Sequence, residues 1–141
     1  YFDGKNWLDV KKDNNFVKYF LNGQEHREDG PALIEYYYNG NIHVEEYYQN
    51  GVLHREDGPA ILYYENYHKL PKSEEYWHNG KRHREDGPAV LWYHKTDSIY
   101  HKEYWINDII FSMRKLIDVG IDINNIPFTK NDMMKYKMYF G

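Results

Sequence analysis

His26-Arg27-Glu28-Asp29-Gly30-Pro31-Ala32 occurs again without a change at residues 54–60 and 83–89. The copies are spaced by 28 and then 29 residues, and an Asn-Gly pair begins four residues before each copy. A fixed period of about 20 to 50 residues is typical of repeat proteins, in which each unit packs against its neighbours. A fourth turn is due near residue 107, where the chain has Asn107-Asp108. This repeated segment decides the fold, and it predicts an array.

Each Asn-Gly pair predicts a tight β-hairpin, because both central positions of a type I′ turn require positive φ. The Asp-Gly of the repeated segment does not predict a second hairpin. The residue after that glycine would have to return an N–H across the turn, and Pro31, Pro59 and Pro88 have none. We therefore predict that Gln24 to Tyr38 forms one long strand, bent at Gly-Pro by a bulge or kink.

The predicted fold is mainly β, an elongated open antiparallel sheet of stacked hairpins with a C-terminal helical cap. The array covers residues 1–107, with units near 15–42, 43–71 and 72–107 and a partial unit over 1–14. From Asp108 the apolar period changes from two to about 3.6 residues. Ile109 and Ile110 begin an apolar stripe, and Asp108 can cap a helix. We expect residues 108–141 to be helical and to cover an open sheet edge.

The composition of the chain argues against some classes of binding partner and some cellular locations. The chain is tyrosine-rich, with 16 tyrosines among 141 residues, and it has a net charge of −4 and no cysteine. Nucleic acid and anionic membranes are not expected partners, because both require a basic face. A chain without cysteine fits a reducing compartment, and no apolar run has the length of a membrane span. The expected location is the cytoplasm.

The pattern of aromatic residue, Asn-Gly, His and Gly resembles the MORN repeat, most clearly from Trp77 through His83 to Gly87 and Trp92. The identical repeated segments resemble those of repeat proteins from large DNA viruses and some bacteria. The resemblance covers residues 15–107. The common MORN form differs in having Gly directly after the His and in being a few residues shorter.

This resemblance implies stacked hairpins without catalytic residues, acting in binding or assembly. Members of the family are linked to membrane lipids, dimerisation, partner proteins and, among bacterial variants, antitoxin roles. A viral member would lie in the host-cell cytoplasm or in the virion.

The repeated polar residues favour a structural role over a chemical one. Equivalent histidines in adjacent hairpins lie two strand spacings apart, about 9–10 Å, which is too far to share a metal ion. Identical carboxylate pairs in every unit also do not make one asymmetric active site. We expect no enzyme activity, no metal, no cofactor and no small-molecule substrate. The residues assigned to the structural motif are His26, Arg27, Glu28, Asp29, Gly30, Pro31, His54, Arg55, Glu56, Asp57, Gly58, Pro59, His83, Arg84, Glu85, Asp86, Gly87 and Pro88.

Each motif residue has an expected structural task. The aspartate should fix the bend by bonding nearby backbone N–H groups. The arginine should pair with carboxylates of adjacent units, and the histidine should pack beside a ring of the next unit and bond the bend.

Alternation after each bend separates two sheet faces. Ala32, Ile34 and Tyr36, with their equivalents, form an apolar face that we expect to be buried. The opposite, mixed face carries Tyr37, Tyr63 and Trp92 at regular spacing, and tyrosine and tryptophan are enriched in interface hot spots.

These three rings are the candidate partner-binding residues of a non-enzymatic interaction or scaffold module. Their packing under the C-terminal segment is an equally open alternative. A virion or self-assembling component, paired through the edge at residues 1–21, is an alternative function. An antitoxin or immunity-type binder is a second alternative.

Overall fold

The computed structural model describes residues 1–111 and, beyond them, positions 117, 118, 120, 131, 134 and 138. The strands are β1 (Asp9–Lys12), β2 (Phe16–Leu21), β3 (Gln24–Glu25), β4 (Leu33–Tyr36), β5 (Ile42–Glu46), β6 (Tyr48–Gln49), β7 (Val52–Leu53), β8 (Ile61–Tyr63), β9 (Ser73–Glu75), β10 (Trp77–His78), β11 (Lys81–Arg82), β12 (Val90–Tyr93), β13 (Ile99–Glu103), β14 (Trp105–Ile106) and β15 (Ile109–Ile110). The predicted mainly β fold is confirmed.

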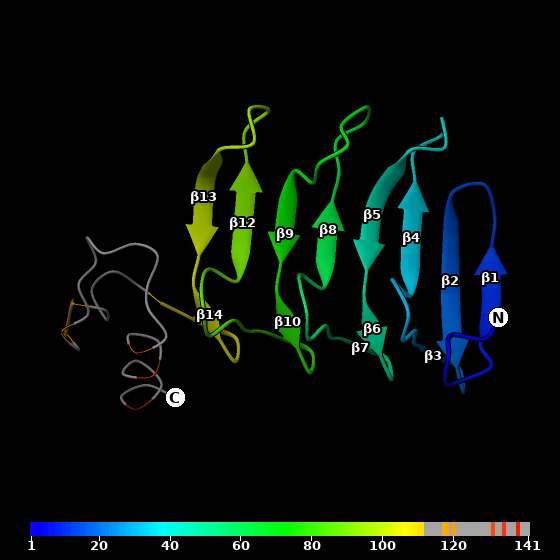
Figure 1. Cartoon of the computed structure of the whole chain (residues 1–141), viewed down its shortest axis with the longest axis horizontal. Helices are drawn as coiled ribbons and strands as arrows, with labels where there is room; N and C mark the ends of the chain where they lie inside the picture. The colour runs from blue at the N-terminus through cyan, green and yellow to red at the C-terminus, as the bar shows by residue number, and fades with distance from the viewer. Residues whose placement is uncertain (112–116, 119, 121–130, 132–133, 135–137, 139–141) are drawn as a thin grey trace.

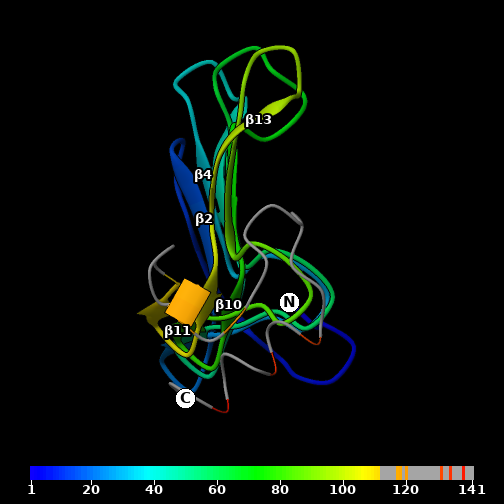
Figure 2. The ribbon, with the colours of Figure 1, turned by 90° about the vertical axis from the view of Figure 1, so that its left-hand side faces the viewer.

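The main sheet is antiparallel and open. Its strands follow the order β1-β2-β4-β5-β8-β9-β12-β13, and β3 also pairs with β2. They lie side by side along the long axis of the molecule, and the side view shows them as one narrow layer (Figures 1 and 2). Three short hairpins, β6-β7, β10-β11 and β14-β15, continue the strands downward (Figure 1).

The Asn-Gly pairs form the predicted hairpin turns. Asn50 and Gly51 have φ of 49° and 80°, and the flanking Gln49 and Val52 are paired across the turn. The fourth turn, Asn107-Asp108, takes the same form with φ of 49° and 65°. Asn and Asp tolerate this left-handed region better than other side chains do, which explains the exchange of Gly for Asp there.

The repeated segment is a loop inserted between two halves of one strand. Tyr47 accepts a hydrogen bond from the N–H of His54 (3.0 Å) and donates its own N–H to the carbonyl oxygen of Ala60 (2.8 Å). Residues 55–59 therefore leave the strand and return at the same rung of the ladder. Tyr19 and Tyr76 hold the other two copies in the same way.

The predicted single strand from Gln24 to Tyr38 is divided into β3 and β4, but both pair antiparallel with β2, so the chain keeps its direction across the repeated segment as predicted. The predicted form of the distortion is wrong. A bulge or kink displaces about one residue, whereas residues 27–31 form a complete excursion between His26 and Ala32.

Burial is concentrated at the level of these loops. The alanines that end the three loops are 0% exposed. The buried apolar residues of the described part are Leu8, Ala32, Leu33, Val44, Ala60, Ala89, Val90, Leu91, Tyr104, Ile106 and Phe111.

The face predicted to be apolar and buried is amphipathic instead. Glu74 lies between Leu62 and Leu91 on this face, since it pairs with both. Tyr93 donates its hydroxyl to Glu74 (3.1 Å), and burial together with the Glu74 charge raises the pKa of Tyr93 to about 12. Residues 1–111 contain no helix that could cover this face. The prediction missed Glu74 because it considered only the residues that follow each bend, whereas Glu74 lies on β9.

The boundary predicted at residue 108 is also wrong. Ile109 and Ile110 form β15 and pair with β14, so they belong to the sheet. Phe111 donates its N–H to the carbonyl oxygen of Tyr104 (2.9 Å), as a histidine does in the earlier units. The positive φ values of the turn commit the following residues to a hairpin whatever their apolar spacing. Most of the predicted helical cap lies outside the described residues.

We expect Gly51→Ala to destabilise the protein by about 1 kcal/mol, because a Cβ at φ of 80° is strained. Gly51→Asp, which copies Asp108 of the fourth turn, should recover part of this loss. Urea unfolding midpoints of the two variants and the wild type measure both effects. Equal midpoints for alanine and aspartate would show that backbone strain is not the cause.

Candidate functional site

The arginine of each loop contacts a tyrosine ring, an aspartate and a backbone carbonyl oxygen, an arrangement that we call a brace. The guanidinium of Arg55 lies 3.9 Å from the centre of the Tyr47 ring. Its Nε donates to Asp57 at 2.9 Å, and its Nη1 donates to the carbonyl oxygen of Pro59 at 3.1 Å. The ring, the carboxylate and the far end of the loop are thereby joined through one planar cation.

The same brace occurs in all three loops. Arg27 and Arg84 lie 4.2 and 4.0 Å from the rings of Tyr19 and Tyr76. Each pairs with the aspartate two residues later, at 2.6 and 2.7 Å. The expected arginine pairing with carboxylates of adjacent units is therefore wrong, since these ion pairs lie inside single loops. The fork of the guanidinium reaches its own loop because the loop folds back over the tyrosine.

The glycine of the motif makes room for this brace. A Cβ on Gly58 would lie 3.1 Å from Cζ of Arg55, closer than a normal contact, and Gly30 has the same relation to Arg27. Glycine is therefore required here by a close approach, in contrast to the turn glycines, which are required by φ.

The histidine connects neighbouring units. Nδ1 of His54 accepts the backbone N–H of Asn79, in the turn of the next unit, at 3.0 Å. His26 accepts from Asn50 at 3.1 Å, and His83 accepts from Asn107 at 3.3 Å. An imidazole that accepts on Nδ1 is neutral and carries its proton on Nε2. Placing a second proton on Nδ1 would set two N–H donors against each other and remove this hydrogen bond.

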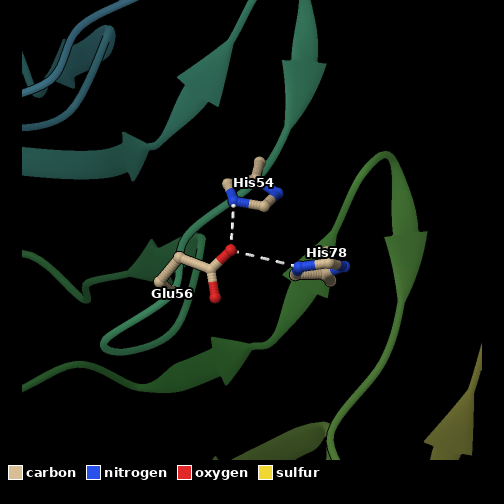
Figure 3. Close-up of side chains that lie close together, drawn as sticks. All are labelled: His54, Glu56 and His78. Atoms are coloured by element: carbon tan, nitrogen blue, oxygen red, sulfur yellow. Dashed lines mark hydrogen bonds and ion pairs between the residues drawn. The ribbon is translucent and has the colours of Figure 1, made fainter.

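One junction between units departs from this repetition. His78 occupies the position of Gln49 and Ile106 in the neighbouring hairpins. Its Nε2 lies 3.1 Å from Oε1 of Glu56, and Nε2 of His54 lies 3.0 Å from the same oxygen (Figure 3). Hydrogen bonding to His78 holds the pKa of the Glu56 carboxyl below its usual range, and His54 adds to the effect.

The ligand atoms of His54, Glu56 and His78 all lie within 4.8 Å of one another, close enough to be tested as a zinc site. A metal-bound imidazole carries its proton on the other ring nitrogen, where it donates. Nδ1 of His54 instead accepts from Asn79. An ion on Nε2 would therefore place an Nδ1 proton against that N–H. The cluster suits two imidazoles that donate to one carboxylate better than it suits a metal.

The candidate partner-binding residues lie on the mixed face of the sheet. His43 brings two of them together, since its ring centre lies 4.4 Å from that of Tyr37 and 4.7 Å from that of Tyr63. Trp92 lies farther along, separated from Tyr63 by one strand, because Ser73 pairs with both. Tyr63 is 37% exposed, and Tyr37 and Trp92 are half-buried.

Neither His78 nor His43 was predicted from the sequence to belong to a site. His78 had a signal, because aligning the hairpins shows one ionisable residue where the others have Leu21, Gln49 and Ile106. His43 joins the aromatic row through a register shift between Glu35 and Tyr36, and alternation along the strand does not predict that shift.

Two open grooves lie between successive loops. They have volumes of about 720 and 610 Å³ and are lined by the arginines and carboxylates of the two flanking loops. The arginines are engaged in their braces, while the side chains of Asp57 and Asp86 are 84% and 76% exposed. The grooves therefore present mainly carboxylates to solvent.

No family model, curated protein or solved structure matches this chain. Among the helices formed by described residues, none has the length and apolar character to cross a bilayer.

Proposed function

We propose that the chain is a MORN-like repeat array that acts as a non-enzymatic scaffold and binds a partner protein through its mixed face. The observation that carries the proposal is the aromatic row of Tyr37, His43, Tyr63 and Trp92 on a one-layer sheet, which no other element of residues 1–111 covers. Rigid rings on a flat sheet supply contact area at little entropic cost, which favours protein recognition.

Charge on the same face favours protein over nucleic acid. Glu46, Glu75 and Glu103 occupy equivalent places beside the aromatic row, because they pair with Leu33, Ile61 and Val90 in register. Stacking of bases on aromatic platforms is normally accompanied by a basic groove that follows the phosphates. A row of carboxylates would repel those phosphates.

Edge strand β1 gives less support to self-assembly. All its residues are exposed, and three of the four are charged: Asp9, Lys11 and Lys12. Charged side chains on an edge strand, lysine above all, disfavour pairing with another copy. A partner protein on the face is therefore preferred to a filament built through this edge.

Affinity capture from extracts of the source cells tests the proposal. Replacing Tyr37, Tyr63 and Trp92 together by Ala should reduce the captured partner at least about tenfold, as loss of interface hot spots does. Tyr38 and Tyr67, 90% and 76% exposed, lie outside the row, and their double replacement by Ala is the matched control.

Thermal melting of both variants must show that the array is still folded. Equal capture by the triple variant and the control would contradict the proposal, as would retention of nucleic acid alone. Light scattering that rises with protein concentration would favour self-assembly instead.

A further inference from the structure

The three imidazoles at the junction between the second and third units lie in a row. The His78 ring centre is 4.6 Å from that of His54 and 5.9 Å from that of His83. All three belong to two neighbouring loops and the hairpin between them. The groove of about 610 Å³ is lined by His78 and His83 and is open to solvent, so protons reach the row.

The charged groups that face this row come from the same two loops. Glu56 accepts from His54 and His78, and Glu85 lies 3.5 Å from Nε2 of His83. The remaining charged groups lining the groove are Arg55, Asp57, Arg84 and Asp86, and each arginine is paired with the aspartate of its own loop. The carboxylate of Glu56 is therefore shared between two imidazoles.

The contacts made by these three imidazoles are favourable only while the rings are neutral. His54 and His83 must then keep Nδ1 unprotonated to accept the N–H groups of Asn79 and Asn107. Proton uptake by His54 removes the acceptor for Asn79, the bond that spans the junction between the second and third units, and protonation of the row places like charges on rings less than 6 Å apart. The ion pair with Glu56 offsets little of this, because the Glu56 side chain is 75% exposed and screened by water.

We propose that His54, His78 and His83 form an acid-sensitive latch that holds the second and third units together at neutral pH and releases them as the imidazoles take up protons. Opening the junction frees Nδ1 of His54 from the N–H of Asn79 to take up a proton, so acid favours the open junction. The latch does not depend on what the aromatic face binds.

The junction between the first and second units provides an internal comparison. There Gln49 replaces the third imidazole and donates its side-chain N–H to the carbonyl oxygen of Arg27 at 3.1 Å. That junction therefore has one imidazole fewer: His26 lies beside Glu28 at 3.5 Å and near the buried carboxylate of Asp3, and His54 lines the groove as His83 lines the later one. Acid should therefore open the later junction first.

Amide hydrogen exchange of the whole chain at pH 7.5 and pH 5.0, corrected for intrinsic rates, tests the latch. Arg55 and Gly80 donate across the later junction, and Arg27 and Gly51 donate across the earlier one. We expect protection at Arg55 and Gly80 to fall at least about tenfold at pH 5.0, and protection at Arg27 and Gly51 to fall less than about threefold. Equal losses at both junctions, or no loss, would overturn the latch.

Two variants isolate the titrating groups. His78→Gln copies Gln49 and should bring the later junction close to the earlier one in acid sensitivity. His54→Asn keeps an acceptor, Oδ1, near the place of Nδ1 but does not titrate. The double variant should lose the difference between the junctions, and an unchanged difference would rule the imidazoles out. If a variant fails to fold, the two junctions of the wild type still decide the question.

Discussion

Arg55→Ala should lower the free energy of unfolding by about 3 kcal/mol and the melting temperature by about 10 °C. The loss combines the stack on Tyr47 with the charged hydrogen bond to the carbonyl oxygen of Pro59. Arg55→Lys should recover little, because an ammonium lacks the planar fork that reaches ring, carboxylate and carbonyl together.

Lys81, an exposed residue of β11, provides the control for this prediction. Lys81→Ala removes a cation of similar length that braces no loop, and it should change stability by less than about 0.5 kcal/mol. Chemical unfolding of the three variants beside the wild type decides the matter. An Arg55→Ala protein as stable as Lys81→Ala would show that the brace does not hold the loop.

Ala60→Leu should destabilise the protein by about 2–3 kcal/mol. Ala60 is 0% exposed, and its backbone is bonded on both sides, by its N–H to Glu75 and by its carbonyl oxygen to Tyr47. The strand therefore cannot move aside to admit three more carbons, and overpacking has a cost of this size.

Ile61→Leu is the matched change at the next position, which is only half-buried. It conserves volume and should cost less than about 1.5 kcal/mol. Guanidinium unfolding midpoints compare the two. A tolerated leucine at residue 60 would mean that the space between adjacent loops is larger than the structure shows.

The sequence predicted those features that depend on local backbone chemistry. Asn-Gly identified the turns, and the missing N–H of Pro31 correctly excluded a second tight hairpin. The shape of the loop could not be predicted in the same way, because it depends on a contact between Arg27 and Tyr19, on different segments of the chain. A tyrosine does stand eight residues before each motif arginine, so the sequence contained the signal.

Side-chain contacts across strands were harder to predict than turns. The spacing of equivalent histidines in successive units gave no indication of His78, which approaches His54 from a different position in the repeat. The apolar stripe from Ile109 favoured a helix, while the preceding Asn107-Asp108 turn placed the first two residues of the stripe in a strand. Local turn geometry outweighed side-chain periodicity at that boundary.

Because the loops are identical, one whole repeat unit can be lost or gained without creating a new sequence at the junction. Misaligned recombination between two copies of the repeated coding sequence removes or adds one whole unit. Deletion of residues 33–60, for example, would join Ala32 to Ile61, the same neighbour that the alanine of the second unit already has. The hybrid keeps the same backbone partners, because Arg27 and Arg55 donate to equivalent carbonyl oxygens, those of Tyr48 and Trp77. A chain with one unit more or fewer therefore keeps the same backbone hydrogen bonds at its new junction.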